Sequence, residues 1–329
     1  MAVTSVRDTS TEGGGRGSGP PASGAPKRRK RQIIPYFLLL PAVIAVAIVM
    51  VGPMLVGVLM SFLHLNQFTI ANWTTAPWAG LANFRIAVNL SEPIARNLLS
   101  SLGLTAGYTV VVVGVSWALG MAGAVFLSDA FRGRAWLRSL FLLPYAIPVY
   151  VGVMVWTLMF QQNGAVNTLL GRDLHLVSQS TFWLAGSDAF WSMVITTVWR
   201  TWPFAFLMLL AGLQAIPREH YEAARVDGAT RWQEFIKVTM PSVRQVSLLL
   251  VLITGFWTFN DFTTPFIMFS TAPPSSARLM SIEIYINSIV NLNFGLGAAM
   301  AVIMIILLII ASFVYLRLLN MRVGDVTNA

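Results

Sequence analysis

Cysteine is absent from this chain of 329 residues, and charged residues make up only 11% of it. The absence of cysteine excludes disulfides, thiolate zinc sites and cysteine nucleophiles. A soluble domain of this length carries about a quarter charged residues, so the low fraction here indicates that most of the chain lies in lipid. The hydrophobic content of 56% supports the same conclusion.

Motifs for catalysis and for nucleotide binding are also missing. No Gly-x-x-x-x-Gly-Lys-Ser/Thr phosphate loop occurs, and the Gly-rich segment at 13–20 lacks both the Lys-Ser/Thr ending and a flanking strand. No His-Glu-x-x-His or Gly-x-Ser-x-Gly motif occurs, and the three histidines are scattered. We therefore expect this chain to be no enzyme and to hold no metal or cofactor of its own.

Long apolar segments dominate the rest of the chain. A membrane-spanning helix needs about 20 predominantly apolar residues. Prolines inside such helices are tolerated because neighbouring helices satisfy the freed carbonyls. The pattern predicts an all-α polytopic membrane protein whose six-helix transmembrane domain covers residues 33–320. The six predicted spans are 35–63, 97–128, 137–160, 189–216, 245–270 and 295–319.

The net charge of +9 has an uneven distribution that gives the topology. Lys and Arg concentrate before the first span, between spans two and three, between spans four and five, and after the sixth. Because basic residues are retained in the cytoplasm, both termini are predicted to be cytoplasmic. Residues 1–32 are then a disordered basic tail and residues 321–329 a short C-terminal tail. Topology explains the basic excess, so we expect no nucleic-acid partner.

A charged connection lies between the fourth and fifth spans, on the predicted cytoplasmic side. Pro217 suits the first turn of a helix, and Gly228 can end that helix in a left-handed conformation. Thr230 can cap a second helix, which Pro241 would end. The pattern predicts a helix–turn–helix over residues 217–241 that is presented to the cytoplasm; a plain surface loop with two amphipathic turns is the alternative.

The order of residues in this connection resembles the EAA motif of ABC importer permeases. The matching residues are Glu222, Ala223, Ala224, Gly228 and Pro241. Val238 and Met240 stand where isoleucine and leucine are usual. Further segments, at 79–84, 142–148, 163–170, 199–204 and 211–217, are similar to the carbohydrate branch of that family. The resemblance covers about residues 33–320.

The resemblance implies the fold and the assembly. It implies the maltose-type, type I ABC importer permease fold in a bacterial plasma (inner) membrane, surrounded by lipid. It implies a second permease subunit, an extracytoplasmic solute-binding protein, and two ATPase subunits that bind ATP and Mg and receive residues 217–241 as coupling helices. The expected substrate is a sugar. The alternatives are a polyol or a glycerol phosphate, or an ion-coupled secondary transporter that uses Asp261.

Two ionisable residues fall at membrane depth. A charge there is energetically costly, so a charged residue at that depth indicates a functional site. Arg200 and Asp261 lie roughly 17 Å and 14 Å from the outer ends of spans four and five. We expect them to face the bundle interior and to pair, either as a structural pair or in contact with substrate. Pro203 frees the carbonyl of Trp199, and Pro265 frees that of Asp261.

Aromatic and amide side chains surround this expected pair. Trp199 precedes Arg200, and Phe256, Trp257 and Asn260 precede Asp261 by one to five residues. Sugars present apolar C–H faces and hydroxyl edges, which suit aromatic rings beside amides and carboxylates. These residues are predicted to line the substrate path, with packing between helices as the alternative.

Two packing patterns complete the prediction. Span two carries two pairs of small residues, each at four-residue spacing, which favour close helix contact either within the chain or with a second permease. Residues 279–290 place apolar side chains on one face at helical spacing, which predicts a short outer helix near the membrane surface. The residues concerned are Gly103, Gly107, Gly120 and Ala124, and Leu279, Ile282 and Ile286.

Overall fold

The computed structural model describes residues 34–178 and 181–327, so the predicted tail at 1–32 and the last two residues lie outside the described residues. The described part is helical, and it contains one isolated β-bridge, between Leu63 and Trp78, and no strand. Five helical segments are long and apolar enough to cross a membrane. They are Leu38–Met60, Pro93–Phe126, Asp188–Gln214, Arg244–Phe269 and Phe294–Arg317. These segments confirm the all-α prediction and agree with five of the six predicted spans.

The predicted third span, at 137–160, is broken. It consists of α5 (Arg134–Ala146) and α6 (Val149–Met159), which meet at an angle of 89°. The break follows from Pro148, because the residue before a proline is pushed out of the helical region. Ile147 accordingly has φ −77° and ψ 133°. The pair counts as a sixth span only if the bent helices are taken together.

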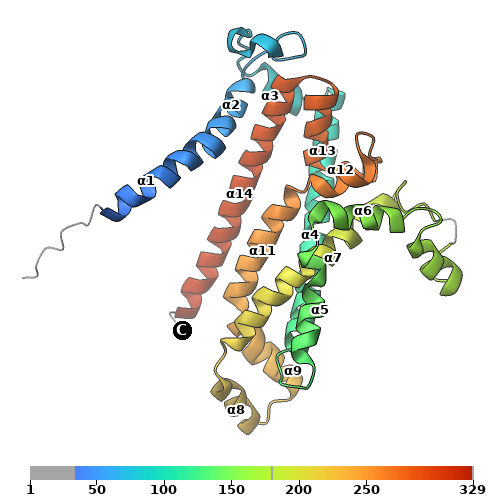
Figure 1. Ribbon diagram of the computed structural model, residues 1–329. Coiled ribbons are helices and arrows are strands. Elements are labelled where there is room, and N and C mark those ends of the chain that lie inside the picture. The colour runs from blue at the N-terminus through green and yellow to red at the C-terminus, as the bar shows by residue number, and fades with distance from the viewer. Residues whose placement is uncertain (1–33, 179–180, 328–329) are drawn as a thin grey trace, which may run out of the picture. The chain divides into compact units, whose positions relative to one another are not determined.

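The chain divides into two compact units at Gly52. The first contains α1 (Ile34–Val46) and a π-helical turn, η1 (Ala47–Val51). The second begins with the remainder of α2 (Gly52–Met60) and holds every later element (Figure 1). Its first elements are η2 (Ile70–Thr75), α3 (Ala82–Val88), α4 (Pro93–Phe126), α5, α6, η3 (Asn167–Asp173) and α7 (Asp188–Gln214).

Packing in the second unit centres on α4 and α7, which have the most extensive contact of any two helices. A Cβ atom on Gly120 would lie 2.7 Å from the Cβ of Ala205, so only glycine permits this approach. Ala124 is fully buried nearby. A Cβ on Gly103 or Gly107 would meet nothing within 4 Å. The small-residue stripe is therefore split: one half packs inside the chain and the other half faces away from it.

The C-terminal part of the unit adds helices against this centre. They are α8 (Arg218–Val226), α9 (Arg231–Glu234), η4 (Phe235–Thr239), α10 (Met240–Ser242), α11 (Arg244–Phe259), α12 (Thr263–Phe269), η5 (Ser275–Ala277), α13 (Met280–Tyr285), η6 (Ile286–Val290) and α14 (Phe294–Thr327). The helix predicted at 279–290 is thus confirmed as α13 and η6. Its apolar face packs inside the chain, because Leu279, Met280 and Ile282 are fully buried and α13 contacts both α4 and α14. Helix α14 also continues past residue 320, where the membrane domain was predicted to end.

Candidate translocation pathway and coupling surface

A pocket of about 640 Å³ opens where helices of the second unit are interrupted. Its walls come from the break between α5 and α6, from the middle of α7, and from the break between α11 and α12. The lining residues are Tyr145, Ala146, Ile147, Pro148, Val149, Arg200, Thr201, Phe204, Trp257, Thr258, Asn260, Asp261, Phe262 and Thr263. Backbone that leaves helical geometry at membrane depth is tolerated where it lines such a cavity.

Four of the residues predicted for the substrate path line this pocket: Arg200, Trp257, Asn260 and Asp261. The other two do not. Trp199 packs edge-on against Trp156, with ring centroids 5.9 Å apart. Phe256 is 51% exposed, and its carbonyl accepts a hydrogen bond of 2.9 Å from the Asn260 amide.

Asp261 stands between α11 and α12 and is held by hydrogen bonds from several elements. Its Oδ1 accepts from the backbone N–H of Thr264 at 3.1 Å, in the first turn of α12. Its Oδ2 accepts from the hydroxyl of Tyr108 on α4 at 3.0 Å. The Thr197 hydroxyl, on α7, lies 2.7 Å from that of Tyr108. A buried carboxylate needs such donors, because unpaired charge in the interior is costly.

The backbone carbonyl of Asp261 also has a partner. Pro265 cannot donate to it, as the sequence predicts. The Ser281 hydroxyl, on α13, donates to this carbonyl at 2.7 Å instead. Asp261 therefore connects the break in the fifth span to three other helices, α4, α7 and α13.

The predicted ion pair between Arg200 and Asp261 does not form. Among the described residues the ion pairs are Arg225–Glu234 and Arg278–Glu283. The physical reason is that hydroxyl and amide donors on α4 and α12 already occupy the Asp261 oxygens. The residue as a whole is 7% exposed. The Nε of Arg200 is buried and has no hydrogen-bond partner among the described residues.

Sequence reasoning missed Tyr108, Thr197 and Ser281, which hold Asp261 in place. Their only sequence signal is a hydroxyl inside or next to an apolar segment, and a hydroxyl on a membrane helix more often bonds its own backbone. Thr105 shows that local alternative, since its Oγ1 donates to the Ser101 carbonyl at 2.6 Å.

The pocket combines aromatic faces with polar edges. Trp257 and Phe204 pack at 5.1 Å between ring centroids and present an aromatic wall. Asn260, Thr201 and the Arg200 guanidinium supply hydrogen-bonding groups on the same cavity. Such a lining suits a polyhydroxylated ligand, whose C–H faces stack on rings while its hydroxyls meet donors and acceptors.

The charged connection forms the predicted helix–turn–helix. Gly228 ends α8 with φ +78°, a left-handed conformation that favours glycine. Thr230 caps α9 by accepting from the Gln233 N–H at 3.3 Å, and the Gln233 side chain accepts from the Thr230 N–H at 2.8 Å. This reciprocal arrangement is a capping box, which fixes where the second helix begins. Pro217 stands just before α8 rather than in its first turn.

Pro241 does not end the second helix, contrary to prediction. The path stays helical through α9, η4 and α10, and it departs from helical ψ only at Val243, with φ −89° and ψ 4°. The π-helical turn of η4 precedes Pro241, which then occupies the first turn of α10. A proline is tolerated in a first turn because the missing N–H has no intrahelical role there.

A groove of about 460 Å³ runs between α8 and the segment η4–α10. Ala223, Ala224 and Pro241 line it, together with charged neighbours such as Glu219, Asp227 and Lys237. Glu222 and Gly228 are exposed outside the groove. Figure 1 shows α8 at one end of the second unit, and the α3 segment lies at the opposite end. Three residues of the EAA-like motif therefore line the groove, and the other two are exposed outside it.

Comparison with known proteins identifies the fold. A solved structure of a bacterial ABC transporter involved in the import of the acidic polysaccharide alginate matches 88% of this chain and 95% of its own, with a TM-score of 0.69 and 20% identity. At that identity the likeness establishes the type I importer permease fold alone.

Curated relatives are closer in sequence. The inner membrane ABC transporter permease protein YcjO of Escherichia coli (strain K12) is 32% identical over 283 residues, which cover 84% of this chain and 92% of the relative. The diacetylchitobiose uptake system permease protein DasB of Streptomyces coelicolor is 31% identical over 320 residues, which cover 95% and 94%. The trehalose/maltose transport system permease protein MalF of Thermococcus litoralis is 29% identical over 290 residues, which cover 87% and 94%.

A family model, described as the binding-protein-dependent transport system inner membrane component, matches residues 111–325. That range is more than half of the chain, and it contains the pocket residues on α5, α7 and α11 as well as the helix–turn–helix. Together with relatives above 30% identity over most of the chain, it establishes that this chain belongs to the family of binding-protein-dependent ABC transport permeases of the inner membrane.

Proposed function

We propose that this chain is one of two membrane subunits of an ATP-driven importer of a mono-, di- or oligosaccharide. An extracytoplasmic binding protein delivers the sugar, and two partner ATPase subunits bind ATP and Mg and hydrolyse the ATP. Relatives named for trehalose/maltose and diacetylchitobiose transport support the sugar class. A relative named for sn-glycerol-3-phosphate transport is 27% identical, but a phosphate ester would find only one cation, Arg200, in this pocket.

The observation that carries the proposal is the exposed helix–turn–helix of residues 218–242. No residue of α8 is buried, although the helix connects two apolar spans. Its charges are balanced in sign, whereas a segment that binds anionic lipid would be basic overall. A soluble protein partner explains such a surface, and in a family of importer permeases that partner is the ATPase.

The proposed cycle is alternating access. Closure of the ATPase dimer on ATP moves α8, the helices rotate, and the pocket opens to receive sugar from the binding protein. Hydrolysis returns the pocket to the cytoplasmic side. Trp257, Asn260 and Arg200 then contact the passing sugar, and Asp261 holds the break in the fifth span.

The test is purification of the chain from its native membrane in a gentle detergent, with bound proteins identified by mass spectrometry. Recovery of an ATPase and a second six-span protein is expected. Gly228→Pro should abolish this recovery and transport while leaving membrane insertion intact, because proline cannot adopt φ +78° and removes the N–H that donates to the Arg225 carbonyl at 3.0 Å.

Gly228→Asn is the matched control, because asparagine tolerates the left-handed region and should retain the ATPase. If the wild-type chain is recovered alone even after cross-linking, the importer assignment is overturned. Retention of the ATPase by Gly228→Pro with normal transport would instead refute the coupling role of the turn.

A further inference from the structure

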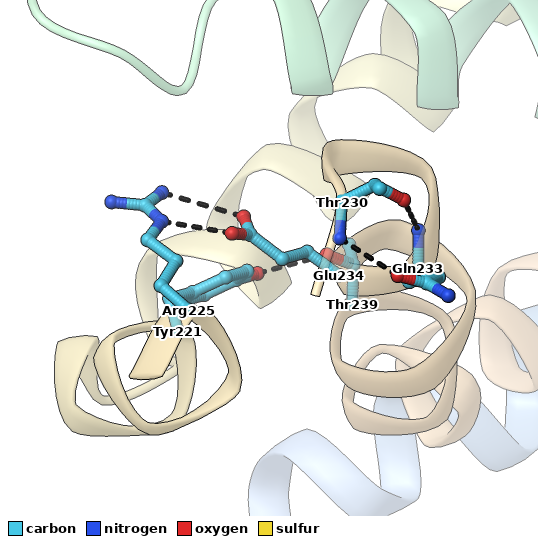
Figure 2. A network of polar contacts seen from close by, with 6 residues as sticks. All are labelled: Tyr221, Arg225, Thr230, Gln233, Glu234 and Thr239. Carbon is cyan, nitrogen blue, oxygen red and sulfur yellow. Dashed lines mark hydrogen bonds and ion pairs between the residues drawn. The ribbon is translucent and has the colours of Figure 1, made fainter. Parts of the chain in front are cut away.

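Helix α8 has very little apolar support. None of its nine residues is buried, and Val226 at its end is 87% exposed. Among the described residues, its side-chain hydrogen bonds to the next helical segment run from Tyr221 to Thr239 and from Arg225 to Glu234. Figure 2 shows Tyr221 and Arg225, one turn apart on α8, both directed toward the segment that follows the Gly228 turn. The orientation of α8 therefore depends on a small number of side-chain bonds.

The stronger of these bonds joins Arg225 to Glu234 through two parallel hydrogen bonds. The Nε–Oε1 distance is 2.8 Å and the Nη2–Oε2 distance is 3.3 Å. The planar guanidinium makes this two-point contact directional as well as attractive. The carboxylate is well shielded, since the Glu234 side chain is 10% exposed against 65% for that of Arg225. The Arg225 hydrogen bond also holds the pKa of Glu234 below its ordinary value, so the pair is ionised at neutral pH.

A second bond lies farther along the same contact. The Tyr221 and Thr239 hydroxyls are 3.0 Å apart. Glu234 directly precedes η4 and Thr239 ends it, so α8 is fastened near both ends of this π-helical turn. The capping box at Thr230 fixes the start of the same segment. Two points of attachment define the angle of α8 as well as its distance.

The order of the helices along the chain shows how this contact could carry a displacement from α8 to the pocket. Helix α7 leads into α8 through residues 215–217, and η4 leads through α10 into α11. Helix α11 ends at the pocket, beside Asn260 and Asp261. Without the contact, a push on α8 would reach α11 only through the turn at 227–230.

We infer that Arg225 and Glu234 are positioning residues that lock α8 to η4, so that displacement of α8 is transmitted to α11 and the pocket. The inference rests on the proposed function, in which an ATPase moves α8. It assigns to the two side chains a role in transmission that is separate from binding the ATPase, because the Glu234 carboxylate is shielded and both guanidinium hydrogen bonds of Arg225 are directed to it.

The experiment uses the complete complex reconstituted in lipid nanodiscs, with spin labels on cysteine pairs. The natural chain has no cysteine, so introduced pairs are its only labelling sites, and cysteines of the partner subunits are replaced beforehand. Labels at Val226 and Ile236, both exposed, report the lock itself. Labels at Leu119 on α4 and Leu249 on α11, also exposed, report the movement caused by ATP with vanadate. Neither readout requires knowledge of the sugar.

Four variants separate transmission from folding and docking. Arg225→Glu and Glu234→Arg reverse one charge each, Arg225→Glu with Glu234→Arg reverses both, and Glu234→Gln keeps the shape of the side chain. The single variants should broaden the Val226–Ile236 distance and reduce the ATP-induced Leu119–Leu249 change about threefold or more, while the ATPase stays bound. The double variant should restore both the narrow Val226–Ile236 distance and the full ATP-induced Leu119–Leu249 change. Arg218→Gln, which removes an exposed α8 charge outside the pair, is the control and should change neither distance.

The outcomes distinguish the two proposals. If the wild-type chain binds no ATPase, the proposed function fails. If the ATPase binds and the single variants, Glu234→Gln included, keep the full ATP-induced change, the lock is refuted while the function stands. Failure of the double variant to restore the change, with the ATPase still bound, would also refute the lock, because an ion pair should tolerate exchange of its partners.

Discussion

At the scale of single residues, Asp261 shows how a charge is kept inside a membrane protein. Its oxygens accept from Tyr108 and from the N–H of Thr264, and its carbonyl accepts from Ser281. A hydrogen bond to an ionised group contributes about 1.5–3 kcal/mol, roughly twice a neutral one. Asp261 is therefore fastened by neighbouring helices, and Arg200 remains free to meet a ligand in the pocket.

This arrangement predicts which pairs of residues are coupled. Tyr108→Phe and Asp261→Asn should show a coupling free energy of at least about 1 kcal/mol in a double-mutant cycle on unfolding, because one hydrogen bond joins them. Arg200→Gln and Asp261→Asn should show a smaller coupling, since no ion pair joins them. Thermal unfolding in detergent measures both cycles. Tyr145→Phe, at a pocket tyrosine that is 47% exposed, is the control and should leave stability unchanged. Larger coupling for the Arg200 pair would contradict the structure.

Glu234 gives a pH dependence at the same scale. Hydrogen bonding to Arg225 lowers its pKa in the folded state, so the pair stabilises the fold above the ordinary Glu pKa of about 4.3. That contribution is lost as pH falls through the lowered folded value. The unfolding midpoint of the wild-type chain should exceed that of Glu234→Gln at pH 7, and the difference should shrink below about pH 4. A difference that stays constant with pH would mean that the carboxylate charge is not involved.

At the scale of elements, the contact between α4 and α7 depends on one glycine. An alanine Cβ at Gly120 would lie 2.7 Å from the Ala205 Cβ and from the Phe206 nitrogen. Such overpacking costs about 1–3 kcal/mol. Gly120→Ala should lower the thermal unfolding midpoint accordingly. Gly114→Ala on the same helix is the matched control, because a Cβ there meets nothing within 4 Å, and it should be neutral or slightly stabilising.

Elements with strong periodic or capping signals could be predicted from the sequence, and elements defined by tertiary partners could not. Five apolar spans, the Gly228 turn and the Thr230 cap follow from local residues, and each is found. Whether the helix breaks at Ile147–Pro148 depends on whether neighbouring helices satisfy the backbone carbonyls that the proline leaves unpaired. The sequence alone does not give that packing. The burial of α13 likewise depends on α4 and α14, since its apolar spacing fits a membrane surface equally well.

The candidate site divides in the same way. Residue type and depth place Arg200, Trp257, Asn260 and Asp261 near one another, and all four line one pocket. Which of them pair is decided by side-chain direction, and the sequence does not record that Tyr108 reaches Asp261 from a helix 153 residues earlier. Trp199 does not line this pocket for the same reason, because its ring packs against that of Trp156.

At the scale of the whole molecule, the pocket and the helix–turn–helix are joined by the same two helices. Helix α7 carries Arg200 and leads to α8, while η4 and α10 lead to α11, which ends at Asn260. A displacement at α8 therefore has two covalent routes to the pocket walls. This geometry suits a transporter in which the energy source acts at a distance from the substrate, as proposed for a partner ATPase.

The energy source is the property of the whole molecule that separates this proposal from ion-coupled transport. In vesicles of the native membrane, uptake of radiolabelled sugar should require ATP and the purified binding protein, and it should continue when an uncoupler collapses the proton gradient. Asp261 is hydrogen-bonded as a structural anchor, so Asp261→Asn should lower uptake through reduced stability, with no change in its pH dependence. Uptake that survives depletion of ATP but stops with the uncoupler, and that loses its pH dependence in Asp261→Asn, would instead make Asp261 a proton site. In that case the exposed α8 surface would need a partner other than an ATPase.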